Sequence, residues 1–279
     1  MGLALLGTAW LGLIFVVRAY RWRALLLPTV SADLSSCFSA TVIGFMGNNI
    51  LPLRGGEILR IYALSRLGAV PPSTAIATGI FDRLFDVLAV TVLILVCVPL
   101  APVLKEYRIV AVVGLSIVVG LFGASLGLTY ASRIGRRLWL PHRIRRAVDR
   151  VSKDLQVFRD IRLLLKTIVS TLVIWLGMVV YFWILLWSYG LILPVEVSLL
   201  VVVFLAVGVA LPSAPGFVGV YHYAVVLALS LFAVEKGDAV AFSIISHLLQ
   251  YIPVTAAGLV LLIGSGISLW PQQRQEEGC

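Results

Sequence analysis

The sequence predicts an all-α integral membrane protein with several membrane-crossing helices, and three observations lead to this fold class. Of the 279 residues, 61% are hydrophobic and only 13% are charged, whereas soluble domains carry roughly a quarter charged residues. The mean hydropathy is +1.05. The apolar runs are long and do not alternate with polar residues, which favours helices over the strands of a membrane barrel.

Eight apolar segments follow one another along the chain, and about 20 such residues are needed to cross the hydrocarbon layer as a helix. The first segment is followed by Arg18, Arg21 and Arg23. We therefore expect this segment to be the first membrane span, with the N-terminus outside a plasma-membrane protein and the C-terminus in the cytoplasm. The segments cover roughly residues 3–17, 34–51, 74–100, 108–130, 167–190, 195–212, 219–234 and 239–264.

The basic residues decide which segments cross. Eleven of the 22 lysines and arginines lie within 131–166, and basic loops of this kind stay in the cytoplasm. If every segment crossed, this loop would lie outside. We therefore expect segment 34–51 to turn at 48–52 and to return through 56–68, which makes a re-entrant hairpin.

A second hairpin is expected from 195–212 and 219–234, entering from the outside. Its sequence LPSAPGF at 211–217 parallels LPLRGGE at 51–57. The later SHLLQ at 246–250 falls where the first copy has DRLFD at 82–86. These parallels predict one transmembrane domain over 1–279 with two inverted repeats, about 34–100 and 195–264.

The basic loop at 131–166 has an internal pattern of its own. Apolar residues recur at spacings of three and four between Ile144 and Phe158, with arginines on the other faces. This pattern is typical of an amphipathic helix on anionic headgroups. A helical connector packed on neighbouring helices would give the same pattern. Between two apolar segments, the loop does not indicate a nucleic-acid partner.

Ionisable residues at membrane depth are the first candidates for a functional site, because burying them there is costly. Asp82 and Asp86 lie one helical turn apart on a shared face, and Arg83 lies on a neighbouring face. The three form either a structural charge network or a site where Arg83 meets an anionic headgroup.

The first hairpin adds Asn49, Arg54, Glu57 and Arg60 to the candidate site. Glu57 and Arg60 can pair on one helical face, and we expect Gly55 and Gly56 to form the tight turn before the returning helix. A helix start beside two arginines suits a phosphate group. In the alternative, the glycines only shape the turn and the arginines reach the cytoplasmic headgroups.

The second hairpin offers Gly216, His222 and His247. His247 sits at the place that Arg83 holds in the first repeat, so we expect it to face the same cavity. A single histidine in an apolar helix is also often a packing residue. We find no metal-ligand spacing, no cofactor motif and no catalytic constellation, so we expect a protein that is not an enzyme.

Three motifs together resemble the lysylphosphatidylglycerol synthase transmembrane family (UPF0104). They are NILPLRGGEILR at 49–60, DRLFD at 82–86 and PSAPGFVG at 212–219; RAYRW at 18–22 is similar to the family's basic stretch after its first span. The resemblance covers nearly the whole chain. It departs from the family at His222, where an acidic residue is common, and at His247, where an arginine is common.

The resemblance implies a flippase-like domain that moves an anionic or modified phospholipid between leaflets. We expect a stand-alone member that lacks the soluble aminoacyltransferase domain of the bifunctional relatives. Arg54, Arg60 and Arg83 would then hold a headgroup phosphate. The substrate is a membrane phospholipid or a polyprenyl-linked lipid, and a homo-oligomer is possible. The alternatives are a membrane enzyme or accessory subunit acting on polyprenyl-phosphate glycolipids or lysylphosphatidylglycerol, and a structural partner of another membrane enzyme.

Overall fold

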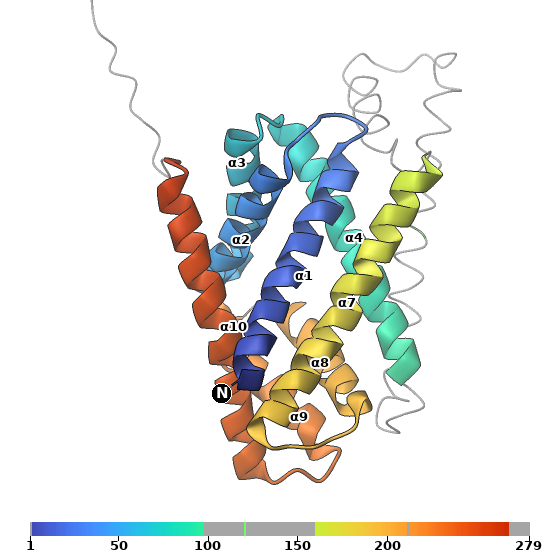
Figure 1. The fold of residues 1–279 in the computed structure, drawn as a ribbon, viewed down its shortest axis with the longest axis vertical. Helices are drawn as coiled ribbons and strands as arrows, with labels where there is room; N and C mark the ends of the chain where they lie inside the picture. Colours follow the sequence, from blue (N-terminus) through green and yellow to red (C-terminus); the bar gives the residue numbers. More distant parts are fainter. Residues whose placement is uncertain (1, 98–119, 121–159, 211–212, 268–279) are drawn as a thin grey trace, which may run out of the picture.

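The computed structural model describes residues 2–97, 120, 160–210 and 213–267, and in these ranges the secondary structure is helical (Figure 1). The predicted segment 108–130, apart from residue 120, and the predicted amphipathic helix in the 131–166 loop lie outside the described residues. The elements are α1 (Gly2–Leu26), α2 (Leu34–Ile50), the 3-10 turn η1 (Pro52–Arg54), α3 (Gly56–Leu67), α4 (Pro72–Cys97), α7 (Ile161–Tyr189), α8 (Val195–Ala210), the 3-10 turn η5 (Pro215–Phe217), α9 (Val220–Ser230) and α10 (Lys236–Gly264).

Long apolar helices form the frame of the bundle. By length and composition, α1, α7 and α10 can each cross a membrane. Large apolar side chains point outward from them, among them Leu5 at 69%, Val260 at 70% and Ile263 at 79% exposure. A soluble protein would cover such a surface, whereas lipid tails solvate it. The all-helical membrane fold is therefore confirmed.

Helix α1 is longer than the first apolar segment. It continues nine residues past Val17, the last residue of the apolar segment, to Leu26 and so includes the three arginines. Arg21 is fully buried inside the bundle. Carboxylates on α4 neutralise its charge there, which removes the cost that would otherwise drive an arginine out to the headgroups.

The two predicted hairpins are present as helix pairs. α2 and α3 pack on each other around η1, and α8 and α9 pack on each other around η5. In Figure 1 the α2–α3 pair lies in the upper half of the bundle and the α8–α9 pair in the lower half. The turns η1 and η5 touch near the middle.

The tips of the hairpins share an unusual backbone. Leu53 and Arg54 in η1 have φ of 53° and 56°, and Gly216 and Phe217 in η5 have φ of 66° and 59°. Each pair directly follows a proline. The backbone therefore matches Pro52 with Pro215, whereas the sequence comparison aligned Pro52 with Pro212.

The role of the glycines in the first tip also differs from the prediction. Gly55 has an ordinary right-handed backbone, so the left-handed turn is made by the two residues before it. Gly56 instead permits a close approach of α3 to α2. A Cβ at Gly56 would collide with the carbonyl oxygen of Gly44 and the backbone nitrogen of Asn48.

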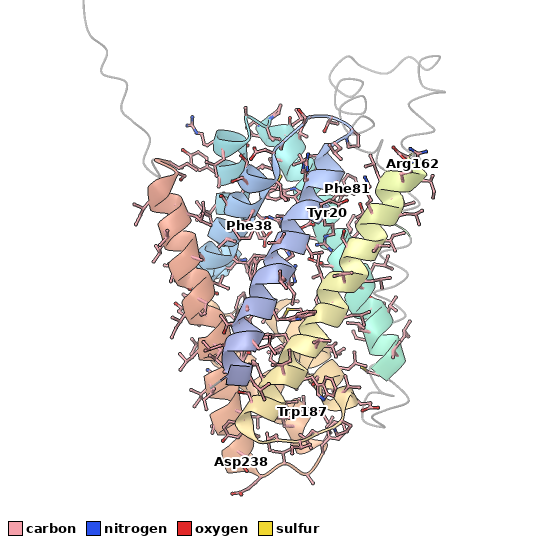
Figure 2. All side chains as sticks on the ribbon, in the orientation of Figure 1. Tyr20, Phe38, Phe81, Arg162, Trp187 and Asp238 are labelled. Carbon is pink, nitrogen blue, oxygen red and sulfur yellow. The ribbon has the colours of Figure 1, made fainter. Side chains whose placement is uncertain are left out.

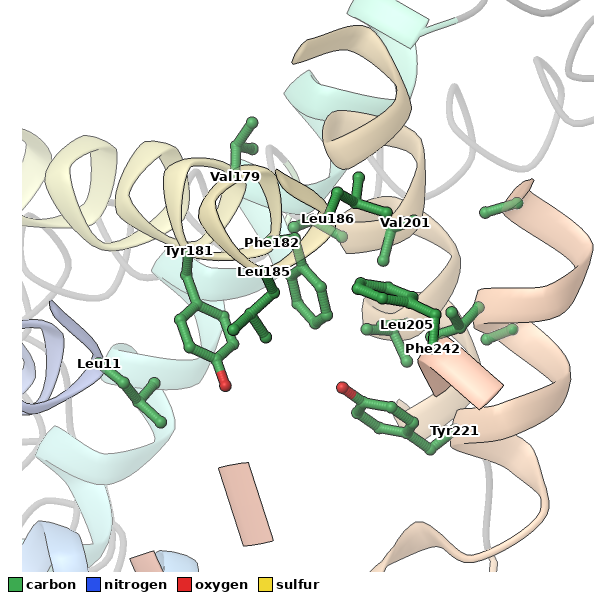
Figure 3. Close-up of a cluster of buried hydrophobic side chains, with 14 of the residues drawn as sticks. Leu11, Val179, Tyr181, Phe182, Leu185, Leu186, Val201, Leu205, Tyr221 and Phe242 are labelled. Carbon is green, nitrogen blue, oxygen red and sulfur yellow. The ribbon is translucent and has the colours of Figure 1, made fainter. Parts of the chain in front are cut away.

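Buried apolar side chains fill the lower half of the bundle between α1, α7, α8, α9 and α10. Figure 3 shows Leu11 of α1, Phe182 and Leu185 of α7, Val201 of α8 and Phe242 of α10 in this core. On α1, the indole of Trp10 donates a hydrogen bond to the carbonyl of Gly177 at 2.8 Å. This contact fixes α1 against α7, its most extensive neighbour.

We predict that Gly56→Ala destabilises the protein by about 1–3 kcal/mol, because the added methyl group meets backbone that cannot rotate away. Thermal unfolding of purified protein in detergent measures the effect. Gly79→Ala on α4 is the matched control, since a Cβ there meets nothing within 4 Å. It should stabilise by about 0.5–1 kcal/mol, as expected for alanine in a helix interior. Equal melting temperatures for the two variants would contradict the prediction.

Candidate functional site

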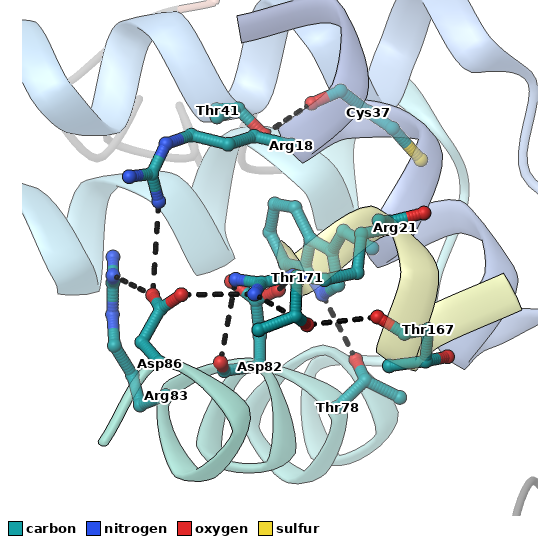
Figure 4. Close-up of polar contacts among 12 residues, drawn as sticks. Arg18, Arg21, Cys37, Thr41, Thr78, Asp82, Arg83, Asp86, Thr167 and Thr171 are labelled. Carbon is teal, nitrogen blue, oxygen red and sulfur yellow. Dashed lines mark hydrogen bonds and ion pairs between the residues drawn. The ribbon is translucent and has the colours of Figure 1, made fainter. Parts of the chain in front are cut away.

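A network of buried charges holds the upper half of the bundle together (Figure 4). Its centre is Arg21 of α1, which lies between Asp82 and Asp86 of α4. The Arg21 Nε donates to Asp82 Oδ1 at 2.8 Å, and its Nη1 lies 2.8 Å from Asp86 Oδ1. Nη1 also donates to the hydroxyl of Thr171 on α7 at 3.1 Å. One side chain thus links three helices.

Arg60 of α3 binds the other oxygen of Asp82. Its Nη2 donates to Asp82 Oδ2 at 2.8 Å, and its guanidinium lies 3.8 Å from the ring centroid of Trp22. The Trp22 indole in turn donates to the hydroxyl of Thr78 at 3.1 Å. Arg60 is only 2% exposed, so it fastens α3 to α1 and α4.

Arg83 connects this network to the tip of the first hairpin. Its Nε donates to Glu57 Oε2 at 3.1 Å, its Nη2 donates to Glu57 Oε1, and its Nη1 donates to Asp86 Oδ2 at 3.0 Å. Glu57 Oε1 also accepts a bond from the Asn48 amide at 3.3 Å. Arg18 approaches the same oxygen of Asp86 at 3.7 Å.

Positive charge exceeds negative charge in this part of the molecule. The region contains five arginines and three carboxylates. The arginines are Arg18, Arg21, Arg54, Arg60 and Arg83, and the carboxylates are Glu57, Asp82 and Asp86. Buried charges are stable only when opposite charges or hydrogen bonds compensate them. The surplus of two positive charges therefore makes the region attractive to an anion.

A cavity of about 160 Å³ lies beside the network, where the two hairpin tips meet. Arg18, Arg54, Glu57 and Arg83 line it on the side of the first tip, and His247 lines it on the side of the second. Its other walls are mostly apolar and come from α1, α2, α7, α8 and α10. The cavity can accommodate several water molecules or a small polar group.

Arg54 has no hydrogen bond or ion pair with any described residue, and its Nε is buried without a partner. A buried donor without an acceptor costs about 1–3 kcal/mol. The left-handed backbone at 53–54 carries this side chain into the cavity lining. Arg54 is therefore the cation that a ligand could satisfy most directly.

The second tip is tied down by polar contacts of α10. The His247 Nε2 lies 2.9 Å from the Gly216 carbonyl oxygen, and the His247 ring stacks on Tyr221 with centroids 4.4 Å apart. Because that carbonyl only accepts, the neutral ring carries its proton on Nε2. The Tyr251 hydroxyl donates to the Asn49 carbonyl oxygen at 3.4 Å, which joins α10 to the first tip.

Half of the predicted site residues line the cavity, namely Asn49, Arg54, Glu57, Arg83 and His247. The other half do not. Asp82, Asp86 and Arg60 lie behind the cavity and orient the residues that line it. Gly216 contacts His247 through its carbonyl, and a side chain there would strike Tyr251. The ring of His222 lies 5.0 Å from that of His247.

The sequence analysis missed Arg18 and Arg21 as site residues, because a basic stretch after an apolar segment normally marks the cytoplasmic side. Arg18 and Arg21 lie three residues apart and Asp82 and Asp86 lie four apart, so each pair shares one helix face. This complementary pair of faces is the signal that could have identified the two arginines. Trp175 of α7, whose indole donates to Asp86 Oδ1 at 3.1 Å, gave no such signal.

We predict that Arg21→Met destabilises the protein by about 3–5 kcal/mol, since Asp82 and Asp86 then lose the buried cation between them. Arg54→Met is the matched control, because the described residues give Arg54 no partner to lose. Its stability should equal or exceed that of the parent, because the substitution removes a buried donor that has no acceptor. Thermal unfolding in detergent separates the two, and equal losses would contradict the assignment of Arg21 to the structural network.

Comparison with known proteins agrees with this picture. A UPF0104 membrane protein of Methanocaldococcus jannaschii is 32% identical over 77 residues, which cover 26% of this chain and 23% of the relative. The chain thus matches about a quarter of that relative's length. No solved structure matches the chain. The family model described as "Lysylphosphatidylglycerol synthase TM region" matches residues 1–258. This multi-pass membrane protein therefore belongs to the lysylphosphatidylglycerol synthase TM region family.

Proposed function

We propose that the chain is a lipid transporter of the flippase or scramblase type, which passes a phosphate-bearing headgroup between leaflets through the cavity at the hairpin tips. The observation that carries the proposal is Arg54, a cation without a described partner in a cavity with surplus positive charge. Arginine donors match the geometry of phosphate oxygens.

The physical difficulty of lipid translocation is the headgroup. Moving its charge into hydrocarbon costs free energy, whereas the acyl chains are apolar and stay in hydrocarbon throughout. A cavity with arginines at bilayer depth replaces the water that the phosphate gives up. In this proposal Arg18, Arg54 and Arg83 contact the phosphate, while Arg60 acts through its ion pairs with Asp82 and Glu57.

The arrangement of the hairpins supports alternating access from two sides. α3 begins at Gly56 and α9 at Val220, while α4 begins at Pro72 and α10 at Lys236, each pair 164 residues apart. We infer that the two units are inverted repeats whose hairpins re-enter the membrane from opposite faces. Transporters with such repeats bind substrate where the broken helices meet.

Charges at the ends of the bundle support one orientation. Figure 2 shows Arg162 at the top of the bundle and Asp238 at the bottom. Arg23 and Arg66 lie in the last turns of α1 and α3, which end at the top in Figure 1. Glu235 and Asp238 flank Lys236 at the start of α10, at the bottom. The positive-inside rule assigns the basic end to the cytoplasm. The N-terminus then lies outside and the 131–166 loop faces anionic cytoplasmic headgroups.

We propose transport rather than catalysis. The described residues do bring a hydroxyl and an imidazole together, since Ser243 Oγ lies 3.3 Å from His222 Nδ1. However, Ser243 is fully buried, donates to the Val240 carbonyl and does not line the cavity. It is therefore not placed to attack a substrate there.

In proteoliposomes that contain an anionic phospholipid with an acyl-chain fluorophore, the parent protein should expose the inner-leaflet pool to a membrane-impermeant quencher. We predict that Arg54→Ala slows this exposure about tenfold or more, because a charge-assisted contact to the phosphate is lost. Arg162 is an exposed arginine in the first turn of α7. Arg162→Ala is therefore the matched control, and this variant should transport lipid at the parent rate.

Two outcomes would contradict the proposal. One is a parent protein that leaves the inner-leaflet pool protected for every phosphate-bearing headgroup tested. The other is a chemically altered lipid formed by detergent-solubilised protein in the absence of a bilayer, which only an enzyme can produce.

We predict that cysteine at position 66 is labelled from the cytoplasmic side and cysteine at position 236 from the outside. Both positions are exposed at opposite ends of the bundle. The background replaces the three native cysteines by serine. Sided labelling of intact cells with an impermeant maleimide makes the measurement, and the reverse pattern would overturn the proposed topology.

A further inference from the structure

Every carboxylate oxygen of Glu57, Asp82 and Asp86 already binds at least one arginine. Both oxygens of Asp82 bind arginines, namely Arg21 and Arg60. Asp86 Oδ1 binds Arg21 and the Trp175 indole, while its Oδ2 binds Arg83.

Glu57 is the one carboxylate among those three that lines the cavity, and it is occupied as well. Arg83 donates to both of its oxygens, and the Asn48 amide donates to Oε1. Asn48 also lines the cavity and its Oδ1 has no partner among the described residues, but this amide oxygen is neutral and cannot balance the charge of an ammonium group. An ammonium group that entered the cavity would therefore find no free anion.

The donors show the opposite situation. Each guanidinium carries five N–H donors and no acceptor. Arg18 makes a single ion pair with a described residue, at 3.7 Å, and Arg54 makes none. Arg21, by contrast, uses its nitrogens on Asp82, Asp86 and Thr171. The two arginines with unused donors are among those that line the cavity.

We propose that the cavity selects headgroups that present phosphate oxygens and carry no amine, and that it discriminates against a lysylated headgroup. The ligand class is a phosphomonoester or phosphodiester lipid with a neutral or hydroxylated headgroup. The inference rests on the proposed function and adds its specificity. It separates this chain from lysylphosphatidylglycerol, the lipid after which its family is named.

The test titrates purified full-length protein in detergent with three ligands, using calorimetry. They are a short-chain phosphatidylglycerol, the same lipid lysylated on its glycerol, and inorganic phosphate. We expect phosphatidylglycerol to bind at least about tenfold more tightly than the lysylated lipid. Arg54→Gln should weaken phosphatidylglycerol binding about tenfold, and Arg162→Gln should leave it unchanged.

A gain-of-function variant tests the same idea without relying on loss of binding. Gln250 lines the cavity, and no described residue hydrogen-bonds its side chain. Gln250→Glu adds the free carboxylate that the parent site lacks. This variant should bind the lysylated lipid more tightly than the parent does and phosphatidylglycerol more weakly, whereas a merely structural effect would lower both affinities together.

The outcomes distinguish this inference from the proposed function. If the lysylated lipid binds as tightly as phosphatidylglycerol and both depend on Arg54, the headgroup specificity is overturned while lipid binding at the cavity stands. If only inorganic phosphate binds, the anion preference stands and the lipid transporter is overturned. If no ligand responds to Arg54→Gln, both are overturned.

Discussion

The burial of Asp82 and Asp86 on one face of α4 is the constraint on which the upper half of this protein depends. Lipid tails are as apolar as leucine, so helices in a membrane gain little from hiding apolar surface from one another. Packing and polar contacts must hold them together instead. Here Arg21, Arg60 and Arg83 reach the two aspartates from α1, α3 and α4.

The same constraint explains why the cavity has a chemical character of its own. A network with equal numbers of acids and bases would be neutral and indifferent to ligands. This network uses up its acids internally and leaves Arg18 and Arg54 at the cavity wall. The same group of arginines thus includes residues that stabilise the fold, such as Arg21 and Arg60, and residues that can bind a ligand, such as Arg18 and Arg54. The geometry of the first hairpin determines the role of Arg54 and Arg60.

Much of the fold could be predicted from the sequence because lipid restricts the choices. The basic loop predicted a turn at 48–52, and the structure has a turn at Pro52–Arg54. The parallel between Arg83 and His247 also agrees with their places on the cavity wall. The partners of these residues could not be predicted. In the sequence, Arg21 resembles a basic residue at the cytoplasmic end of a membrane span, and only the packing of α4 against α1 reveals its ion pairs.

Two further differences have a local physical reason. Arg60 has the charge and position of a phosphate ligand in the sequence, but the Trp22 ring and Asp82 enclose it from both sides. The matching Leu-Pro pairs suggested an alignment of Pro52 with Pro212. The backbone follows the two left-handed residues after Pro52 and Pro215 instead, and left-handed residues carry no fixed sequence signature outside glycine.

Helix α10 contacts both hairpins and contains Pro253. Before it, His247 and Tyr251 hold the second and first tips; after it, Gly258 lies so close to Met46 of α2 that a Cβ there would collide. Proline removes one backbone hydrogen bond from the helix, so bending costs least at this position. The first tip is held on both sides of this position, by Tyr251 before it and by the 2.8 Å hydrogen bond from the Asn49 amide to Thr255 after it. A bend of α10 at Pro253 would therefore change the position of the first hairpin tip.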